Sequence, residues 1–335
     1  MMDFDFLNIN HKSPRPIYRQ LIESMENALR NGILHKGDLL PSVNQVAQAF
    51  NVSRDTVLQA YAELKTRGLV VSYPGKGYYV ERTRVEARHR ILLLFDELNA
   101  FKEDLYNGFV EHLENADVEL YFHHFNAELF QTILFNHKDD YTSYVIMPAV
   151  VKNVASFISV LPQDKVFILD QLPTSLRGLY PAVYQSFEED IFNGFQHGLS
   201  LLQKYEGMVL VYPGGKEPEG FLSGFKKFCT KYFIHSEIIP SMRSVIPRKG
   251  WVYVLVNDRD LVFLIKYCRA NNLKPGLDIG IISLNDTGLK EIVAGGITTI
   301  STDFQAMGER MARMVMNNQH DVVKNPSRLI LRNSL

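Results

Sequence analysis

Two short stretches in the first quarter of the chain combine hydrogen-bonding side chains with a backbone that can approach a partner closely. Ser53, Arg54 and Thr56 lie within four residues of one another, and farther along a lysine stands between two glycines in Gly75-Lys76-Gly77. Arginine donates paired hydrogen bonds to base edges, while lysine, hydroxyl and backbone N–H groups bind phosphate oxygens. These residues predict contact with double-stranded DNA.

A second set of candidate residues lies in the remaining three quarters of the chain, after apolar runs typical of buried strands. Sugar recognition needs groups that donate to and accept from adjacent hydroxyls, and an apolar face for the C–H side of the ring. The candidates for the polar groups are Asn99, Asp170, Asn257 and Asp258, and those for the apolar face are Phe101 and Phe304. Together they predict a binding site for a small sugar.

Other groups that look like chemical motifs have simpler explanations. Gly214-Gly215-Lys216 lacks the spacing of a phosphate-binding loop. His123-His124 has no partner at metal-ligand spacing, and neither Glu188-Glu189 nor Asp303 stands near a nucleophile or an activated base in the sequence. We therefore expect no metal, no cofactor and no catalytic residues.

The first candidate residues lie on elements that predict a helix-turn-helix. Residues 17–31 carry apolar side chains at helical spacing and are followed by Gly32, a helix stop. Ser42 is a natural N-cap for a second helix, and only two residues separate that helix from a third, which Ser53 caps and Gly68 ends. Two short helices joined by so tight a turn are typical of this motif.

A β-hairpin with a basic, glycine-rich tip is expected to follow. Residues 69–73 and 78–80 have strand patterns, and Pro74 begins the turn between them. Such a hairpin predicts a wing, which lays its backbone and Lys76 along the sugar-phosphate chain. Meanwhile the third helix offers its N-terminal residues to the major groove.

The rest of the chain alternates continuous apolar runs with helical segments. The runs cover residues 91–95, 144–147, 166–169, 208–212, 251–256 and 279–284, and the helical segments 101–114, 152–161, 187–204, 219–232, 258–271 and 304–317. Buried strands alternating with helices predict an α/β fold whose parallel sheets are covered on both faces. Ligands of such sheets bind beyond the carboxyl ends of the strands.

Length, charge and cysteine content limit what the whole chain can be. At 335 residues and 46% hydrophobic, it is long enough for two or three compact units. Residues 1–90 hold 13 Lys and Arg against 9 Asp and Glu, and the rest holds 23 against 28, which suits a nucleic-acid-binding head. The two cysteines form no CxxC pattern, and no apolar stretch approaches the roughly 18 residues of a membrane span. We therefore expect a cytoplasmic protein without membrane contact.

The first eighty residues resemble the GntR-family winged-helix signature. The resemblance covers about residues 14–81 and rests on Pro16-Ile17-Tyr18-Arg19-Gln20, Leu40-Pro41-Ser42, Val52-Ser53-Arg54-Asp55-Thr56-Val57, Ala60-Tyr61 and Gly75-Lys76-Gly77-Tyr78. It implies operator contacts from the second helix, the third helix and the wing tip, which adds Ser42 and Asn44 to the candidates. Asn44 and Leu58 stand where the family has arginines, so the operator sequence stays open.

Residues 90–332 resemble the effector domain of the LacI/GalR repressors, which is built like periplasmic sugar-binding proteins. The resemblance rests on residues 96–101, Phe167-Ile168-Leu169-Asp170, Val256-Asn257-Asp258, residues 273–281 and residues 296–308. It implies two lobes with the ligand between them. By the family's plan the chain crosses between the lobes near residues 170, 300 and 320.

This resemblance also carries effector-binding roles onto particular residues. Asp170 and Asn257 match effector-contacting positions, whereas Phe221, Asn285 and Thr302 stand where the family has an arginine, an aspartate and a glutamine. The missing arginine favours a sugar with a less polar edge, such as a deoxy-sugar, although Lys216 on the preceding loop is placed to compensate.

These patterns predict a winged helix-turn-helix domain over residues 1–81, a charged linker over 82–90 and a two-lobed, periplasmic-binding-protein-like α/β domain over 91–335. A winged head on such a body resembles arabinose-repressor-like proteins. The expected function is a homodimeric transcriptional repressor that binds operator DNA and is released by a monosaccharide such as a pentose or deoxy-hexose. The alternative is an enzyme, or a sensor of a non-sugar metabolite, with the same head. Saturable sugar binding without product formation separates the two.

Overall fold

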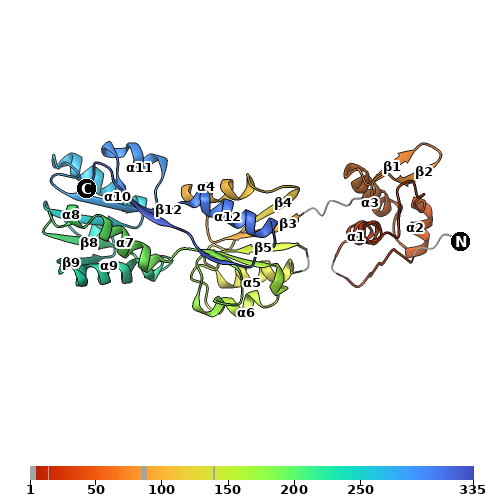
Figure 1. Cartoon of the computed structure of the whole chain (residues 1–335), viewed down its shortest axis with the longest axis horizontal. Coiled ribbons are helices and arrows are strands. Elements are labelled where there is room, and N and C mark those ends of the chain that lie inside the picture. The colour runs from red at the N-terminus through yellow and green to blue at the C-terminus, as the bar shows by residue number, and fades with distance from the viewer. Residues whose placement is uncertain (1–4, 14, 84–88, 139) are drawn as a thin grey trace. The chain divides into compact units, whose positions relative to one another are not determined.

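The computed structural model describes residues 5–13, 15–83, 89–138 and 140–335, and Figure 1 shows the helices and strands. Contacts within the chain divide it into two compact units, the first up to residue 87 and the second from residue 88. Residues 84–88 of the expected linker lie outside the described residues. The first strand of the second unit begins at His89, two residues before the expected domain boundary.

The first unit is a three-helix head with a two-stranded hairpin. Its elements are α1 (Ile17–Arg30), α2 (Val43–Phe50), α3 (Arg54–Thr66), β1 (Val70–Tyr73) and β2 (Gly77–Val80). The two strands pair antiparallel, with Val70 opposite Val80. The predicted helix-turn-helix and its hairpin are therefore confirmed.

Local polar contacts begin both short helices of the head at the predicted residues. The Ser42 hydroxyl accepts from the backbone N–H of Gln45, whose side chain accepts from the backbone N–H of Ser42 in return. The Ser53 hydroxyl accepts from the backbone N–H of Thr56 at 3.1 Å. These caps satisfy N–H groups that have no partner inside the helix, so the boundaries can be predicted from local sequence.

The segment before α1 adds to the core of the head, which the sequence patterns did not predict. Leu7 is 5% exposed and belongs to the same buried cluster as Leu21, Val57 and Leu64, with Phe6 packed against it. The short segment lacks a helical or strand pattern of its own. Its burial depends on the surface that the three helices form.

The second unit contains two six-stranded sheets, each within a lobe that also carries helices. Lobe 1 comprises β3 (His89–Phe95), α4 (Ala100–Val110), β4 (Ala116–Phe122), α5 (Ala127–Asn136), β5 (Ser143–Ile146), α6 (Val154–Ile158), β6 (Val166–Asp170), β7 (Ala182–Tyr184), α12 (Phe304–Met316) and β13 (Val322–Lys324). Lobe 2 comprises α7 (Phe187–His197), α8 (Leu199–Leu202), β8 (Gly207–Val211), α9 (Glu219–Lys231), β9 (Ser236–Ile239), β10 (Trp251–Leu255), α10 (Asp258–Ala270), β11 (Gly280–Leu284), α11 (Gly288–Ile292), β12 (Thr298–Thr302) and β14 (Ser327–Ile330).

Both sheets have the predicted parallel topology, except that the lobe 2 sheet has one antiparallel strand at its edge. The strand order is β13-β7-β6-β5-β3-β4 in lobe 1 and β14-β12-β11-β10-β8-β9 in lobe 2. The edge strand β14 pairs antiparallel with β12. In Figure 1, α4 and α12 cover one face of the lobe 1 sheet, and α5 and α6 cover the other. Because both faces are covered, the strands read as continuous apolar runs.

The chain passes between the lobes after Tyr184, after Thr302 and after Lys324. The predicted crossings near 300 and 320 agree with this path, but the predicted crossing near 170 is wrong. The short strand β7 pairs with β6, so lobe 1 continues for some fifteen residues beyond Asp170. β7 has only three residues, which is too short for its pattern to be recognised in the sequence.

Two glycines allow α4 and α12 to lie in close contact on the sheet. A Cβ on Gly308 would collide with the backbone oxygen of Leu105, and one on Gly108 would collide with the backbone oxygen of Gln305. The close approach anchors the start of α12, where the chain re-enters lobe 1.

No helix among the described residues is both long and apolar enough to cross a bilayer.

Candidate functional site

The predicted DNA-contacting residues of the head lie at the start of α2, at the start of α3 and at the tip of the wing. Asn44, Arg54 and Lys76 are exposed. Gly75 and Gly77 adopt positive φ angles of 74° and 104°, conformations that side chains disfavour. The tip therefore turns tightly enough for its backbone to approach a flat surface.

Two hydrogen bonds, one buried and one exposed, join α3 to the rest of the head. The Tyr61 hydroxyl donates a 2.6 Å hydrogen bond to the Pro41 carbonyl just before α2, and burial raises the pKa of Tyr61. The Lys65 ammonium donates to the Ser72 hydroxyl on β1 at 3.0 Å. The first contact joins α3 to the start of α2, and the second joins it to the wing. The candidate residues consequently form one rigid surface.

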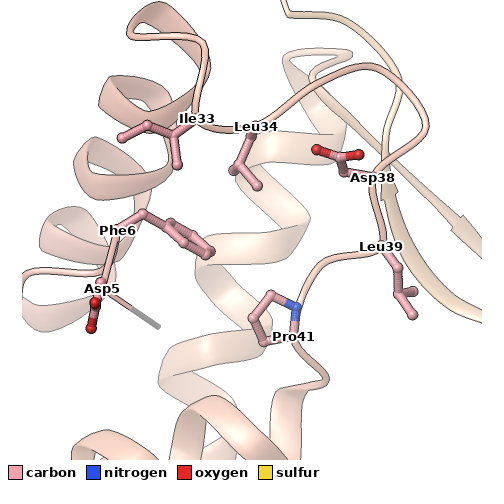
Figure 2. A pocket seen from close by; sticks show the side chains of 7 residues that line it. All are labelled: Asp5, Phe6, Ile33, Leu34, Asp38, Leu39 and Pro41. Atoms are coloured by element: carbon pink, nitrogen blue, oxygen red, sulfur yellow. The ribbon is translucent and has the colours of Figure 1, made fainter. Parts of the chain in front are cut away.

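A hollow between the N-terminal segment and the loop that joins α1 to α2 also lies on the head. Figure 2 shows the seven side chains that line it, with Phe6, Ile33 and Leu34 on one side and Leu39 and Pro41 on the other. Its volume is about 350 Å³. Most of this lining is apolar, and it lies where the N-terminal segment packs on the helices.

The interlobe cleft holds the second candidate site. Its lining comes from both lobes and consists of Asp96, Glu97, Asn99, Phe101, Lys102, Phe125, Asp170, Gln171, Gln185, Phe187, Lys216, Glu217, Pro218, Phe221 and Asn285. The enclosed volume is about 60 Å³. Ligand pockets usually reach about 300 Å³ or more, so the lobes are closed on each other in this structure.

One ion pair joins the two lobes across this cleft. The Lys216 ammonium of lobe 2 donates to both carboxylate oxygens of Glu97 in lobe 1, at 2.5 and 2.6 Å. It also lies over the ring of Phe125, 5.3 Å from the ring centre. The lysine that was predicted to substitute for the missing arginine therefore binds a carboxylate of the opposite lobe.

A buried polar cluster forms the floor of the cleft on lobe 1. Lys102 is 5% exposed and forms an ion pair with Asp96, which is 2% exposed. The Gln185 side chain donates to Asp170 at 2.5 Å. Burial raises the pKa of Asp170 and outweighs the opposing effect of the nearby Lys102 ammonium. Asp170 also has a positive φ of 72°, an uncommon conformation that often marks a functional site.

Four of the predicted effector residues line the cleft. Asn99 caps α4 by accepting from the backbone N–H of Lys102, and Phe101 packs on Phe304 with ring centres 4.8 Å apart. Asn285 has a left-handed backbone that brings it to the cleft, and Asp170 belongs to the buried cluster. These four residues come from the carboxyl ends of strands in both lobes.

The other four predicted effector residues lie outside this lining. Asn257 caps α10 and donates to Asp260, while Asp258 pairs with the buried Lys290 at 3.0 Å. Thr302 is buried and donates to the Pro326 carbonyl, and Phe304 lies behind Phe101. Asp258, which was predicted together with Asp170 as a polar group of the sugar site, therefore does not line the cleft that contains Asp170.

Several cleft residues carried no recognisable signal in the sequence. Gln185 follows β7 and Phe125 follows β4, and both strands were absent from the prediction. Glu217 is half-buried, and burial raises its pKa despite the neighbouring Lys216. The rule that ligands bind beyond strand ends applies to these positions, but only once the strands are known.

A wider groove adjoins the cleft. It has a volume of about 480 Å³ and shares Gln171, Gln185 and Phe187 with the cleft, so the two hollows are neighbours. Arg177 lines it from lobe 1, and Glu188 lines it from lobe 2. The interlobe space therefore extends past the crossing that follows β7.

Comparison with known proteins supports the same division of the chain. Residues 17–80 match the family described as "Bacterial regulatory proteins, gntR family", and residues 211–335 match "Periplasmic binding protein-like domain". This chain is 37% identical over 91 residues to the transcriptional repressor NagR of Bacillus subtilis (27% of this chain), and 36% identical over 83 residues to the mannosyl-D-glycerate system repressor MngR of Escherichia coli (25% of this chain). The chain spans 37% and 35% of the lengths of these relatives.

Solved structures resemble the second unit. A lac repressor dimer bound to operator aligns with a TM-score of 0.60 and 15% identity, over 75% of this chain and 95% of that chain. A LacI family regulator from Enterococcus faecium with bound ribose aligns with a TM-score of 0.57 and 20% identity, over 73% of this chain and 98% of that one. The chain therefore joins a gntR-family head to a body with the periplasmic binding protein-like fold of the LacI repressors.

Proposed function

We propose that this chain is a transcriptional repressor whose head binds operator DNA and whose interlobe cleft binds a small sugar that releases it. The observation that carries the proposal is the union of a gntR-family head with a two-lobed body whose cleft is lined by hydrogen-bonding and aromatic side chains. Proteins with similar heads include repressors. In this role the body binds its ligand without transforming it, and the protein acts in the cytoplasm with the chromosome.

In this proposal the head uses its exposed residues in two ways. Arg54, at the exposed start of α3, reads a base edge in the major groove, and Lys76 contacts phosphate from the wing. The remaining contacts to the DNA backbone come from Ser42, Asn44, Ser53, Thr56, Gly75 and Gly77. The position of these groups on helix starts and on a glycine turn supports the assignment.

We propose that the chain acts as a homodimer that presents two heads to a pseudo-palindromic operator. A protein dimer with two-fold symmetry binds two DNA half-sites that are separated by about one helical turn or a multiple of it. Light scattering of the protein and of its complex with saturating operator checks this, and one chain per operator contradicts it.

The ligand that we propose is a monosaccharide such as a pentose or deoxy-hexose. Asn99, Asp170 and Asn285 supply hydrogen bonds, and Phe101 supplies an apolar face. Phe221 lines the cleft and is only 7% exposed, so an apolar side chain stands where the resemblance expects an arginine. An apolar wall suits a sugar edge that lacks a hydroxyl.

Release of DNA follows if the sugar binds one arrangement of the lobes more tightly than the other. The pocket among the predicted effector residues has a volume of only about 60 Å³, so a sugar that binds there, rather than in the wider groove beside it, must move the lobes apart and change the Lys216–Glu97 pair. A sugar that moves the protein from mostly bound to mostly free needs a differential affinity of several kcal/mol. By linkage, the operator must weaken sugar binding by the same factor.

Selection of bound sequences from a random pool of double-stranded DNA, followed by a screen of monosaccharides, tests the proposal. We expect one preferred, pseudo-palindromic sequence, and at least one sugar that both raises the melting temperature and lowers affinity for that sequence. Mass spectrometry of the sugar after incubation should find it unchanged. DNA binding without sequence preference, or conversion of the sugar, would contradict the proposed function.

A further inference from the structure

The charged groups of the interlobe cleft restrict the class of sugar that it can accept. Four carboxyl groups and two ammonium groups line it, namely Asp96, Glu97, Asp170, Glu217, Lys102 and Lys216. We infer that the cleft takes an uncharged sugar and rejects phosphorylated and carboxylated sugars. This inference rests on the proposed function and names the ligand class of that same site.

Both ammonium groups of the cleft are already bound to carboxylates. Lys102 is buried against Asp96 and has no room to turn toward a ligand. Lys216 binds both carboxylate oxygens of Glu97 and lies over the ring of Phe125. A phosphate that recruited Lys102 would leave the buried carboxylate of Asp96 unpaired, which is strongly unfavourable. A phosphate that recruited Lys216, whose pair is more exposed, would have to replace both of its hydrogen bonds to Glu97.

Two further carboxyl groups, Asp170 and Glu217, have no matching cation in the cleft. If both are ionised, the lining has a net charge of −2, because four carboxylates face two ammonium groups. Burial raises the pKa of each, and protonation of both would bring the lining only to neutrality. A protonated carboxyl is a hydrogen-bond donor and acceptor that suits a sugar hydroxyl, but it offers no charge to an anion.

Helix starts at the cleft give an anion no alternative site. The N-terminus of a helix commonly binds phosphate through free N–H groups and the helix dipole. Here the first turns carry their own acids: Glu103 in α4, Glu219 in α9, and Glu188, Glu189 and Asp190 in α7. A phosphate at the start of α4 or α9 would meet like charge. The acids of α7 are already paired, Glu188 with Lys227 and both Glu189 and Asp190 with Lys324.

The adjoining groove contains a cation that could bind a phosphorylated sugar and so contradict this inference. Arg177 is exposed there and makes no ion pair with another described residue. Glu188 and Glu189 line the same groove from lobe 2, so its charged side chains also sum to a negative value. A phosphorylated ligand that reached Arg177 would lie beside these two carboxylates, which are paired with Lys227 and Lys324 outside the lining, so the Arg177 route needs its own test.

Matched pairs of a sugar and its ester test the inference in the full-length protein. Calorimetry should compare D-ribose with D-ribose 5-phosphate, D-glucose with D-glucose 6-phosphate and D-glucuronate, and any other sugar found in the screen with its phosphate. We expect each charged form to bind at least about 100-fold more weakly than its parent, since like charges across an interface cost several kcal/mol. Charged forms within tenfold of the parent overturn the inference.

Two variants assign the cause of this rejection. Glu97→Gln removes the partner of Lys216. It should therefore reduce the difference in binding affinity between a sugar and its phosphate to about tenfold or less. Glu237→Gln removes the partner of Arg248 at 2.7 Å on the far edge of lobe 2, and it should leave the difference unchanged. If the ratio of sugar affinity to sugar-phosphate affinity is equal in the two variants, lysines already paired with carboxylates are not the cause of the rejection.

The remaining outcomes separate this inference from the proposed function. If a phosphorylated sugar binds and Arg177→Gln abolishes that binding, the protein remains a sugar sensor, but the inference is overturned. If neither the sugars nor their charged forms bind, the proposed function itself fails and the inference falls with it.

Discussion

Asp170 combines three properties that ordinary structural residues rarely share. It is 5% exposed, its backbone is left-handed, and burial raises the pKa of its carboxyl above the ordinary value of 3.8. The Gln185 side chain donates a hydrogen bond to it, although a carboxylate can accept several bonds. The residue is therefore held at a cost to folding and is ready to bond a ligand.

We expect Asp170→Asn to raise the melting temperature near pH 8. The folded-state pKa of Asp170 lies above the unfolded-state pKa, so the cost of burying the carboxylate is absent below the unfolded value and fully present above the folded one. Asparagine carries no charge and tolerates the left-handed backbone. The advantage of the variant should shrink as pH falls toward 4. Thermal unfolding between pH 4.5 and 8 checks this, and a variant less stable than wild type at pH 8 contradicts it.

Arg54 and Lys76 should differ in how their loss affects DNA binding. Arg54→Ala is expected to weaken the preferred sequence by about 1–3 kcal/mol, because a base contact carries specificity. Lys76→Ala should weaken all sequences alike and reduce the salt slope by about one. Fluorescence anisotropy at several salt concentrations checks both. Identical sequence profiles and slopes for the two variants would show that these roles are wrongly assigned.

Half of the predicted effector residues line the cleft, because a place after a buried strand predicts the edge of the sheet but not the partner of each side chain. Asn99 and Asp170 directly follow or end recognisable local patterns, which makes their position predictable. Asp258 was predicted in the same way, from its place after an apolar run, yet the structure pairs it with Lys290, a lysine 32 residues later that the fold brings to it. Such a pairing has no signal in the local sequence.

At the scale of elements, the head was predictable because its boundaries are set by short-range contacts. Ser42 and Ser53 cap the two helices through residues three positions away. In lobe 1, however, β4 and α5 escaped prediction. The strand β4 is partly exposed along most of its length, since it lies at the sheet edge, so its pattern is neither a continuous apolar run nor a clean alternation.

The contact between α4 and α12 leads to a prediction on stability. Gly308→Ala should destabilise the body by about 1–3 kcal/mol, because the added methyl group collides with the backbone of α4. Gly288→Ala is the matched control, because a Cβ at the start of α11 meets no atom within 4 Å. Urea unfolding compares the two. Equal midpoints for both variants would mean that α4 and α12 do not pack this closely.

At the scale of the whole molecule, three chain crossings connect the two lobes, together with ion pairs between Lys216 and Glu97 in the cleft and between Lys324 of β13 and both Glu189 and Asp190 of α7. Crossing segments act as hinges because their backbones can rotate while the lobes stay rigid. A change in the angle between the lobes moves the cleft residues of one lobe relative to those of the other. In the proposed function, sugar binding is therefore coupled to the arrangement of the lobes rather than to a local loop.

Asp170→Ala should abolish release by sugar while leaving operator affinity in its absence nearly unchanged. The variant loses a cleft contact but keeps the head intact. Asp258→Ala is the control, because Asp258 lies outside the cleft; it should keep release by sugar but lower the stability of the body, since it removes the carboxylate that pairs with the buried Lys290. Operator binding titrated with sugar measures both. Release of Asp170→Ala at the wild-type sugar concentration would place the binding site elsewhere.

The last fourteen residues complete both sheets, and this sets an order of events during synthesis. β13 supplies an edge of the lobe 1 sheet, β14 supplies an edge of the lobe 2 sheet, and Ser334 bonds to the backbone of Ile281 and Thr298. The buried cluster of the head, in contrast, uses no residue beyond Val80. If the head binds the operator as proposed, the ribosome therefore releases every residue needed for DNA contact long before either lobe can close. In the proposed function, a chain that lacked residues 322–335 would keep the DNA-binding head and lose the response to sugar.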